Sequence, residues 1–137
     1  MSYFLKLPIA RIWDSLKRYF TRSGPDIGMF AVLNKLGKIA HDNAVAHGFY
    51  ETPPSILERL CLVHSEVSET LEDYRDGHMT PATSGSGKPI GFPSELADII
   101  IRVVDLAYYQ YIDLDEAVRL KMAYNKTRPY KHGCKVL

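Results

Sequence analysis

Four acidic side chains form two short pairs, Glu66-x-x-Glu69 and Glu95-x-x-Asp98, and 25 residues separate the pairs. Residues three apart lie on the same side of a helix, so each pair presents two carboxylates to one face. Oxygen ligands without histidine or cysteine favour Mg²⁺, or Mn²⁺, over zinc. We therefore take all four acids as candidate metal ligands and catalytic residues. The alternatives are a solvated acidic surface and a di-iron carboxylate bundle, but the second requires Glu-x-x-His pairs.

The elements that would position these acids are helices. Apolar residues at helical spacing predict core helices over residues 26–47, 54–76, 94–111 and 114–127. Gly48 and Gly77 are expected to end the first two helices. Thr52 or Ser55 is expected to cap the second helix, and Ser94 the third. No segment shows the alternation of a strand, so the predicted fold class is all-α.

The two acidic helices differ in their apolar faces. In helix 54–76 an apolar stripe is predicted to face the core, with the acids flanking it. Its members are Leu60, Val63, Val67, Leu71 and Tyr74. Helix 94–111 is apolar around almost its whole circumference, which predicts burial on more than one face and a polar line that points inward. Carboxylates gathered in such a seam repel one another, so they would either take up protons or hold cations.

The helix over 114–127 carries a second group of polar side chains. Lys121, Asn125 and Arg128 follow one another at spacings of four and three, so they share a face, and Tyr124 lies beside it. A lysine, an amide and an arginine on one face are suited to phosphate oxygens. The alternative is an ordinary cationic helix terminus, which the helix dipole favours.

Two further segments are distinguished by composition. Residues 77–93 contain three prolines and four glycines and are predicted to form a flexible loop, either a lid or a disordered insert. Residues 1–25 hold five basic side chains and one acidic side chain, a charge of +4, which leaves −3 for the domain at 26–137. This basic arm has the pattern of an amphipathic helix, and we expect it to pack on the bundle or a partner subunit, or to contact a membrane surface or nucleic acid.

Composition predicts one compact domain. The chain has 137 residues, of which 46% are hydrophobic and 24% charged. No apolar stretch approaches the roughly 18 residues of a membrane-spanning helix, and two cysteines are too few for a secreted disulfide framework. We therefore expect a soluble cytoplasmic protein.

The spacing of the acids, together with its context, resembles the MazG-like all-α nucleoside triphosphate pyrophosphohydrolases. The resemblance rests on segments 40–49, 62–69, 95–102 and 121–129 in that order, and it covers roughly residues 27–135. It implies a four-helix bundle that assembles as a homodimer or a dimer of dimers (a homotetramer), with active sites near the subunit interface. The basic arm at 1–25 lies outside the resemblance and is an extra N-terminal segment.

The resemblance also implies an activity. The expected reaction is Mg²⁺-dependent hydrolysis of a ribo- or deoxyribonucleoside triphosphate between the α- and β-phosphates, giving a nucleoside monophosphate and pyrophosphate. Lys121 and Asn125 would contact the phosphates or the sugar, with Tyr124 and Arg128 as further candidates. The preferred base and sugar, and the carboxylate that activates water, stay open at this point. The competing hypothesis is a non-catalytic binding or regulatory module that a metal ion stabilises.

Overall fold

The structure, a computed structural model, describes residues 31–52 and 54–130. The predictions for the basic arm at 1–25, for residues 26–30 of the first helix and for Cys134 lie outside the described residues. No helix among the described residues combines the length and the apolar character needed to cross a membrane.

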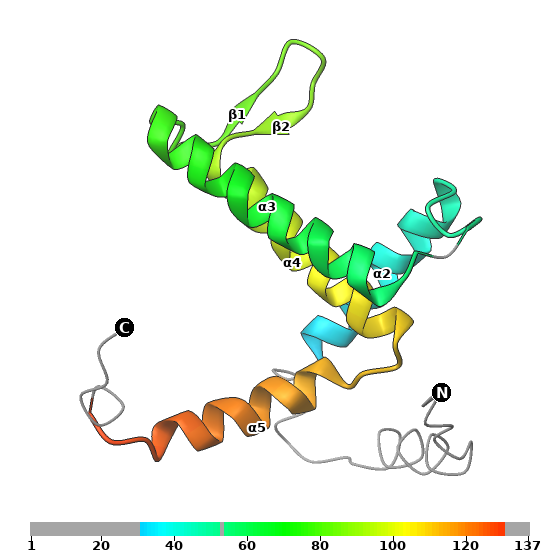
Figure 1. Cartoon of the computed structure of the whole chain (residues 1–137), viewed down its shortest axis with the longest axis vertical. Helices are drawn as coiled ribbons and strands as arrows, with labels where there is room; N and C mark the ends of the chain where they lie inside the picture. Colours follow the sequence, from blue (N-terminus) through cyan, green and yellow to red (C-terminus); the bar gives the residue numbers. More distant parts are fainter. Residues whose placement is uncertain (1–30, 53, 131–137) are drawn as a thin grey trace, which may run out of the picture.

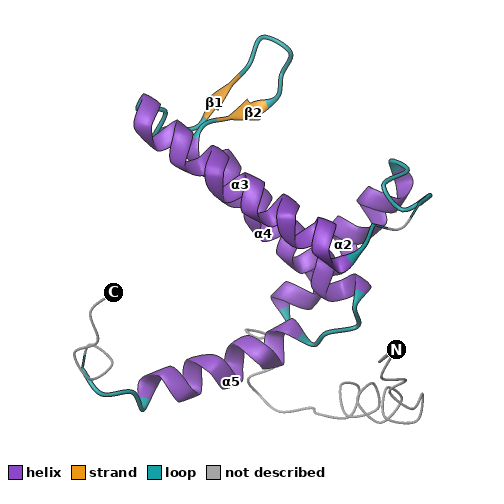
Figure 2. Cartoon of the chain, in the orientation of Figure 1, coloured by secondary structure: helices purple, strands orange, loops and turns teal. Residues whose placement is uncertain are grey.

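The described chain is mostly helical, which confirms the all-α class (Figure 2). Its elements are α2 (Val32–Ala46), α3 (Ile56–Asp76), β1 (Ala82–Thr83), β2 (Pro89–Ile90), α4 (Phe92–Tyr109) and α5 (Leu114–Lys126). The two strands pair antiparallel, with Ala82 opposite Ile90 and Thr83 opposite Pro89. Each strand has only two residues, which is too short for an alternating pattern to be visible in the sequence. The prediction that residues 77–93 form a loop without strands was therefore wrong at β1 and β2.

Helices α3 and α4 form an antiparallel pair joined by the β1–β2 hairpin (Figure 1). Helix α2 packs across the other side of α4, and α5 contacts α2 rather than α3. In Figure 1, α5 lies apart from the α3–α4 pair. Helix α4 is therefore the central element, in contact with both α2 and α3.

Local interactions explain where α3 begins and ends. The Ser55 hydroxyl accepts a hydrogen bond from the Glu58 backbone N–H at 3.2 Å, and the Ser55 N–H donates to the Glu58 carboxylate at 2.5 Å. This capping box satisfies two backbone groups at the helix start. Gly77 ends the helix in the left-handed conformation with φ 79°. The predicted cap at Ser55 and the predicted stop at Gly77 are confirmed.

The start of α4 differs from its prediction. The helix begins at Phe92 with Pro93 in its first turn, and Gly91, not Ser94, is the capping residue. Proline suits this position because the first N–H groups of a helix have no partner within the helix. The Ser94 hydroxyl donates instead to the Pro89 carbonyl at 3.2 Å, so it ties the helix to the hairpin.

Helix α2 approaches α4 closely at Gly37. A Cβ atom at this position would lie 2.7 Å from the Val104 carbonyl oxygen and 3.2 Å from the Tyr108 Cβ. Val104 and Ala107 on α4 are the only buried hydrophobic residues in the described part of the chain. The small core therefore lies at this crossing.

Helices α2 and α5 are joined at their first turns. The Asp115 carboxylate, which is buried, accepts hydrogen bonds from the backbone N–H groups of Leu33 at 3.0 Å and Asn34 at 2.9 Å. The Asn34 side chain in turn accepts from the Leu114 N–H at 3.0 Å and donates to Asp113 at 2.9 Å. Asp115 thus supplies the cap that the residue before α2, Ala31, lacks.

The predicted apolar core face of α3 is wrong for the single chain. Leu60, Val67, Leu71 and Tyr74 are about half exposed, whereas Arg59, Glu66 and Thr70 are buried. The reason is that α3 packs on α4 with its polar face. Apart from Val63, which is half-buried, the apolar stripe is therefore left uncovered by the described residues.

Candidate metal centre

Three acids from two helices meet in the seam between α3 and α4. Ligand oxygens of Glu66 and Glu69 on α3 and of Glu95 on α4 lie within 4.8 Å of one another. Glu66 and Glu95 are buried, and Glu69 is exposed. We call these three residues the acidic cluster. It has the oxygen donors and the open side that a divalent cation with further ligands requires.

Local structure positions the acidic cluster. Glu66 and Glu69 are three residues apart near the middle of α3, so both point to one side. Glu95 lies in the first turn of α4, directly after the hairpin that reverses the chain. The antiparallel pairing brings this turn alongside the acids of α3.

The electrostatics of the acidic cluster oppose its full ionisation. Burial raises the pKa of the Glu95 carboxyl above its usual range, and the negative charges of Glu69, Asp98 and Glu66 raise it further. A hydrogen bond with Glu66 has the same effect. A divalent cation in the cluster would oppose all of the repulsive contributions.

Asp98, the fourth predicted ligand, is not among the three acids that meet. It is half-buried on α4 and is close enough for its charge to affect Glu95, but its oxygens lie outside the 4.8 Å grouping. Its assignment as a metal ligand stays a prediction.

One arginine contacts the acidic cluster. The Arg102 Nε donates to the Glu66 Oε1 at 2.5 Å, and the Arg102 Nη2 lies 2.5 Å from the same oxygen. Arg102 follows Asp98 by four residues and so shares the acidic face of α4, but spacing within one helix does not predict its partner on α3.

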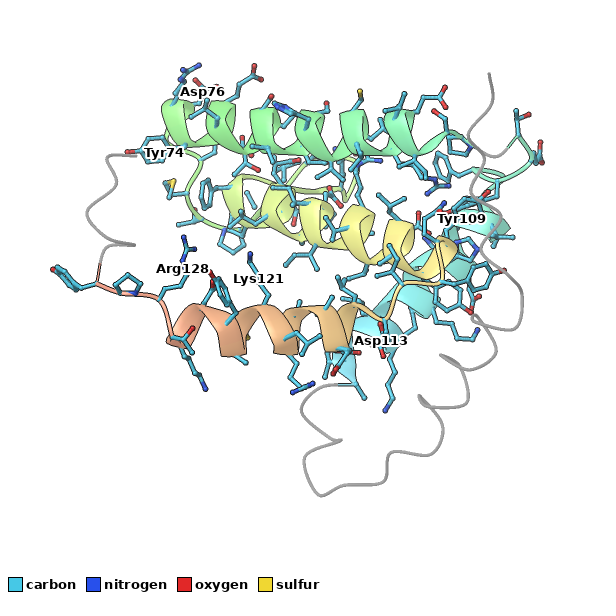
Figure 3. The ribbon with its side chains drawn as sticks, turned by 60° about the horizontal axis from the view of Figure 1, so that its bottom comes forward. Tyr74, Asp76, Tyr109, Asp113, Lys121 and Arg128 are labelled. Atoms are coloured by element: carbon cyan, nitrogen blue, oxygen red, sulfur yellow. The ribbon has the colours of Figure 1, made fainter. Side chains whose placement is uncertain are left out.

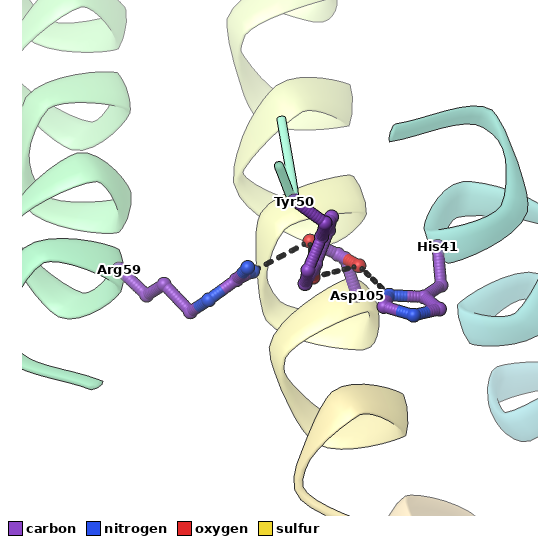
Figure 4. A network of polar contacts seen from close by, with 4 residues as sticks. All are labelled: His41, Tyr50, Arg59 and Asp105. Atoms are coloured by element: carbon purple, nitrogen blue, oxygen red, sulfur yellow. Dashed lines mark hydrogen bonds and ion pairs between the residues drawn. The ribbon is translucent and has the colours of Figure 1, made fainter. Parts of the chain in front are cut away.

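A second polar network lies farther along the same seam (Figure 4). The Asp105 carboxylate accepts from the Arg59 Nη1 at 2.9 Å and from the Tyr50 hydroxyl at 2.7 Å, and its Oδ1 lies 2.9 Å from the His41 Nδ1. The Arg59 guanidinium also stacks over the Tyr50 ring, 4.2 Å from its centroid. Burial, followed by the hydrogen bond to Asp105, raises the pKa of the Tyr50 hydroxyl.

This network was missed by sequence reasoning, although a spacing signal was present. Arg59 precedes Glu66 by seven residues, and Asp105 follows Asp98 by seven, so each continues the acidic face by two helical turns. In an antiparallel pair these extensions meet. His41 and Tyr50 lie outside both helices that carry the acidic motifs, so this spacing gives no signal for them.

The predicted phosphate-binding residues lie on another helix. Lys121, Tyr124, Asn125 and Arg128 are all exposed, the first three on α5 and Arg128 just after it. In Figure 3, Lys121 and Arg128 point from α5 toward the side on which α4 lies. The Lys121 Nζ is 5.9 Å from the centroid of the Tyr124 ring. The single chain does not bring these residues into contact with the acidic cluster.

No family model, curated protein or solved structure matches this chain.

Proposed function

We propose that the chain is a Mg²⁺-dependent nucleoside triphosphate pyrophosphohydrolase. The observation that carries the proposal is the meeting of Glu66, Glu69 and Glu95 within 4.8 Å, from two antiparallel helices. The resemblance of the acidic motifs to MazG-like enzymes supplies the reaction, because the acids alone would suit several kinds of metal chemistry. The proposed substrate is a ribo- or deoxyribonucleoside triphosphate.

The residues present fit a magnesium ion, with Mn²⁺ as a substitute. All donors are carboxylate oxygens, the ligands that these hard cations prefer. Two of the carboxylates are buried in the seam, and burial, followed by repulsion from the neighbouring acids, raises the pKa of Glu95. Asp98 is proposed as a fourth ligand, because it lies next to the cluster on α4.

In the proposed reaction a water oxygen attacks phosphorus at the α–β anhydride. The bond between that phosphorus and the bridging oxygen breaks, so a nucleoside monophosphate and pyrophosphate leave. Mg²⁺ supplies charge neutralisation at the phosphate oxygens and acidification of the attacking water. The carboxylates hold and orient the reactants, and one of them accepts the proton of the water.

We propose that two or four chains assemble to complete the site. In one chain α3 exposes an apolar stripe, and the α5 residues proposed to bind phosphate, Lys121 and Asn125, lie apart from the acidic cluster. We propose that a second copy of the chain covers the apolar surface of α3. The proposed location is the cytoplasm, where unpaired thiols such as that of Cys61 persist. The assembly would be a bundle of paired helices like that of the MazG-like enzymes.

A panel of nucleoside triphosphates incubated with the full chain and Mg²⁺ tests the proposal. We expect pyrophosphate release from at least one of them. Glu69→Gln, Glu95→Gln and Asp98→Asn should each reduce release by at least about a hundredfold, because each removes a carboxylate proposed to hold the Mg²⁺ that stabilises the transition state. Circular dichroism should remain helical in all three variants.

Glu72→Gln is the matched control, since it removes an exposed carboxylate from the same helix outside the acidic cluster. It should leave turnover unchanged. If Mg²⁺ raised the melting temperature but no nucleotide were hydrolysed, the non-catalytic binding module would replace the enzyme as the better hypothesis.

A further inference from the structure

The ion pair between Arg102 and Glu66 is asymmetric in burial. The Glu66 side chain is 7% exposed, whereas the Arg102 side chain is 39% exposed. Two guanidinium nitrogens, Nε and Nη2, converge on the single oxygen Oε1. The Glu66 carboxylate is therefore fixed in the seam. The Arg102 guanidinium has access to solvent, so it can move away from Glu66 and stay hydrated.

Arg102 also lies on the acidic face of α4. It follows Asp98 by four residues and Glu95 by seven, so the three side chains project to the same side. In the described part of the chain, it is the one basic side chain that contacts a member of the acidic cluster. It lines a small cavity of about 30 Å³ with Arg59, Leu62 and Asp105, next to the cluster.

Two positive groups would therefore compete for the Glu66 carboxylate. It belongs to the acidic cluster that would hold a divalent ion, and it is the carboxylate that pairs with Arg102. A divalent ion and a guanidinium beside the same buried carboxylate repel each other, and the repulsion is strong where solvent is scarce. Of the two, the half-exposed guanidinium is the partner that can move.

We propose that Arg102 neutralises Glu66 in the metal-free protein, and that it moves to the phosphates of the bound nucleotide once a divalent ion occupies the acidic cluster. The inference rests on the proposed function, because it takes the cluster as a metal site and a phosphate compound as the ligand. Arginine suits both states, since its planar N–H groups bind carboxylate and phosphate oxygens with similar geometry.

The first test measures metal binding without nucleotide. Mn²⁺ is titrated calorimetrically into the full chain and into Arg102→Gln. We expect Arg102→Gln to bind Mn²⁺ about tenfold more tightly, because a competing charge-assisted hydrogen bond is removed. A merely structural role for Arg102 would weaken Mn²⁺ binding, because the carboxylates would lose their arrangement.

Arg119→Gln is the matched control. Arg119 also pairs with a glutamate, Glu116, and its side chain is similarly exposed at 41%. Arg119 lies on α5, away from the acidic cluster. Arg119→Gln changes the net charge of the chain by the same amount as Arg102→Gln. Mn²⁺ affinity should stay at the wild-type value in this variant.

The second test measures phosphate binding, with magnesium pyrophosphate titrated into protein saturated with Mg²⁺. Arg102→Gln should bind pyrophosphate about tenfold more weakly than wild type, since one charged contact to the phosphates is lost. The effects on metal and on pyrophosphate therefore have opposite signs. Arg102→Lys keeps the charge but not the paired N–H groups, so both of its shifts should be smaller.

Unchanged or weaker Mn²⁺ binding in Arg102→Gln would overturn the proposal, as would unchanged pyrophosphate binding. If Arg102→Gln does not fold, Arg102→Lys decides in the same way, with tighter Mn²⁺ binding expected. The metal titration contains no nucleotide, so it judges Arg102 even if no triphosphate is hydrolysed. If the wild-type chain released pyrophosphate but Arg102→Gln bound Mn²⁺ with unchanged affinity, the proposed enzymatic function would be kept and only the proposed role of Arg102 would be rejected.

Discussion

Glu66 and Glu95 are buried carboxylates that face each other and a third acid across two helices. Such an arrangement does not serve stability, because like charges in a partly dry seam repel and lose hydration. Arg102 offsets only one of the charges. A site of this kind is typical of residues kept for binding a cation, and the unfavourable charge is then a property of the metal-free state.

At this scale we predict that Glu95→Gln stabilises the metal-free protein at neutral pH. The pKa of Glu95 is raised in the folded protein, so the unfolded chain ionises first as pH rises. Its contribution to stability is therefore present at low pH and is lost as pH rises through the folded-state pKa. The amide removes this loss, so the melting temperature of Glu95→Gln should lie a few degrees above that of wild type.

Thermal melting in EDTA between about pH 4 and pH 7 measures this effect, across the range in which glutamate ionises. The difference between Glu95→Gln and wild type should grow with pH. Addition of Mg²⁺ should stabilise wild type and not the variant. Glu72→Gln serves as the control, and an equal gain in Glu72→Gln would assign the effect to net charge instead of to the cluster.

The positions of the helices could largely be predicted from the sequence. The periodicity located α3, α4 and α5 to within two residues at each end, and the chemistry of Ser55 and Gly77 gave both ends of α3. The first helix was predicted from residue 26, whereas α2 begins at Val32. Acids three residues apart also predicted the meeting of Glu66, Glu69 and Glu95, because helical spacing fixes which side chains share a face.

The choice of the face that meets a neighbouring helix was beyond the sequence. Helix α3 has an apolar stripe and a polar stripe, and the apolar one was expected to face the core. The polar stripe packs on α4 instead, because Arg59 and Glu66 find partners there in Asp105 and Arg102. Such long-range pairings depend on the register of two helices, which spacing within one helix does not specify.

We predict that Gly37→Ala destabilises the crossing of α2 and α4. The added Cβ would meet the Val104 backbone oxygen at 2.7 Å, and a backbone atom cannot rotate away. Separating the helices should cost about 1–3 kcal/mol in the free energy of unfolding, as overpacking does elsewhere. Urea denaturation measures this loss.

Gly85→Ala is the control for this change, because a Cβ at Gly85 meets nothing within 4 Å. Its free energy of unfolding should stay within about 0.5 kcal/mol of wild type. Equal stability of Gly37→Ala and Gly85→Ala would show that the two helices are not held at this distance.

The described part of the molecule exposes large apolar side chains on each of its helices. Val104 and Ala107 are the buried hydrophobic residues of its described part, while large apolar side chains on α3, α4 and α5 are exposed. On α3 the exposed apolar side chains include Leu57 and Leu60, on the face opposite Glu66. An exposed apolar surface of this kind is typical of a contact with another chain.

We therefore predict a homodimer or homotetramer in solution, with two or four times the 15.5 kDa of one chain. Light scattering after size-exclusion chromatography measures the mass. Val67→Lys places a charge in the exposed apolar stripe of α3 and should shift the mass toward the monomer. A monomeric wild-type chain over a hundredfold range of protein concentration would contradict the prediction, since association follows mass action.

The proposed activity of the acidic cluster is cleavage between the α- and β-phosphates of a nucleoside triphosphate. Phosphorus NMR of the products formed by the full chain with Mg²⁺ tests it most directly. We expect equal amounts of nucleoside monophosphate and pyrophosphate, and no products in excess EDTA. Orthophosphate released with a nucleoside diphosphate, or no cleavage of any triphosphate in the panel, would contradict it.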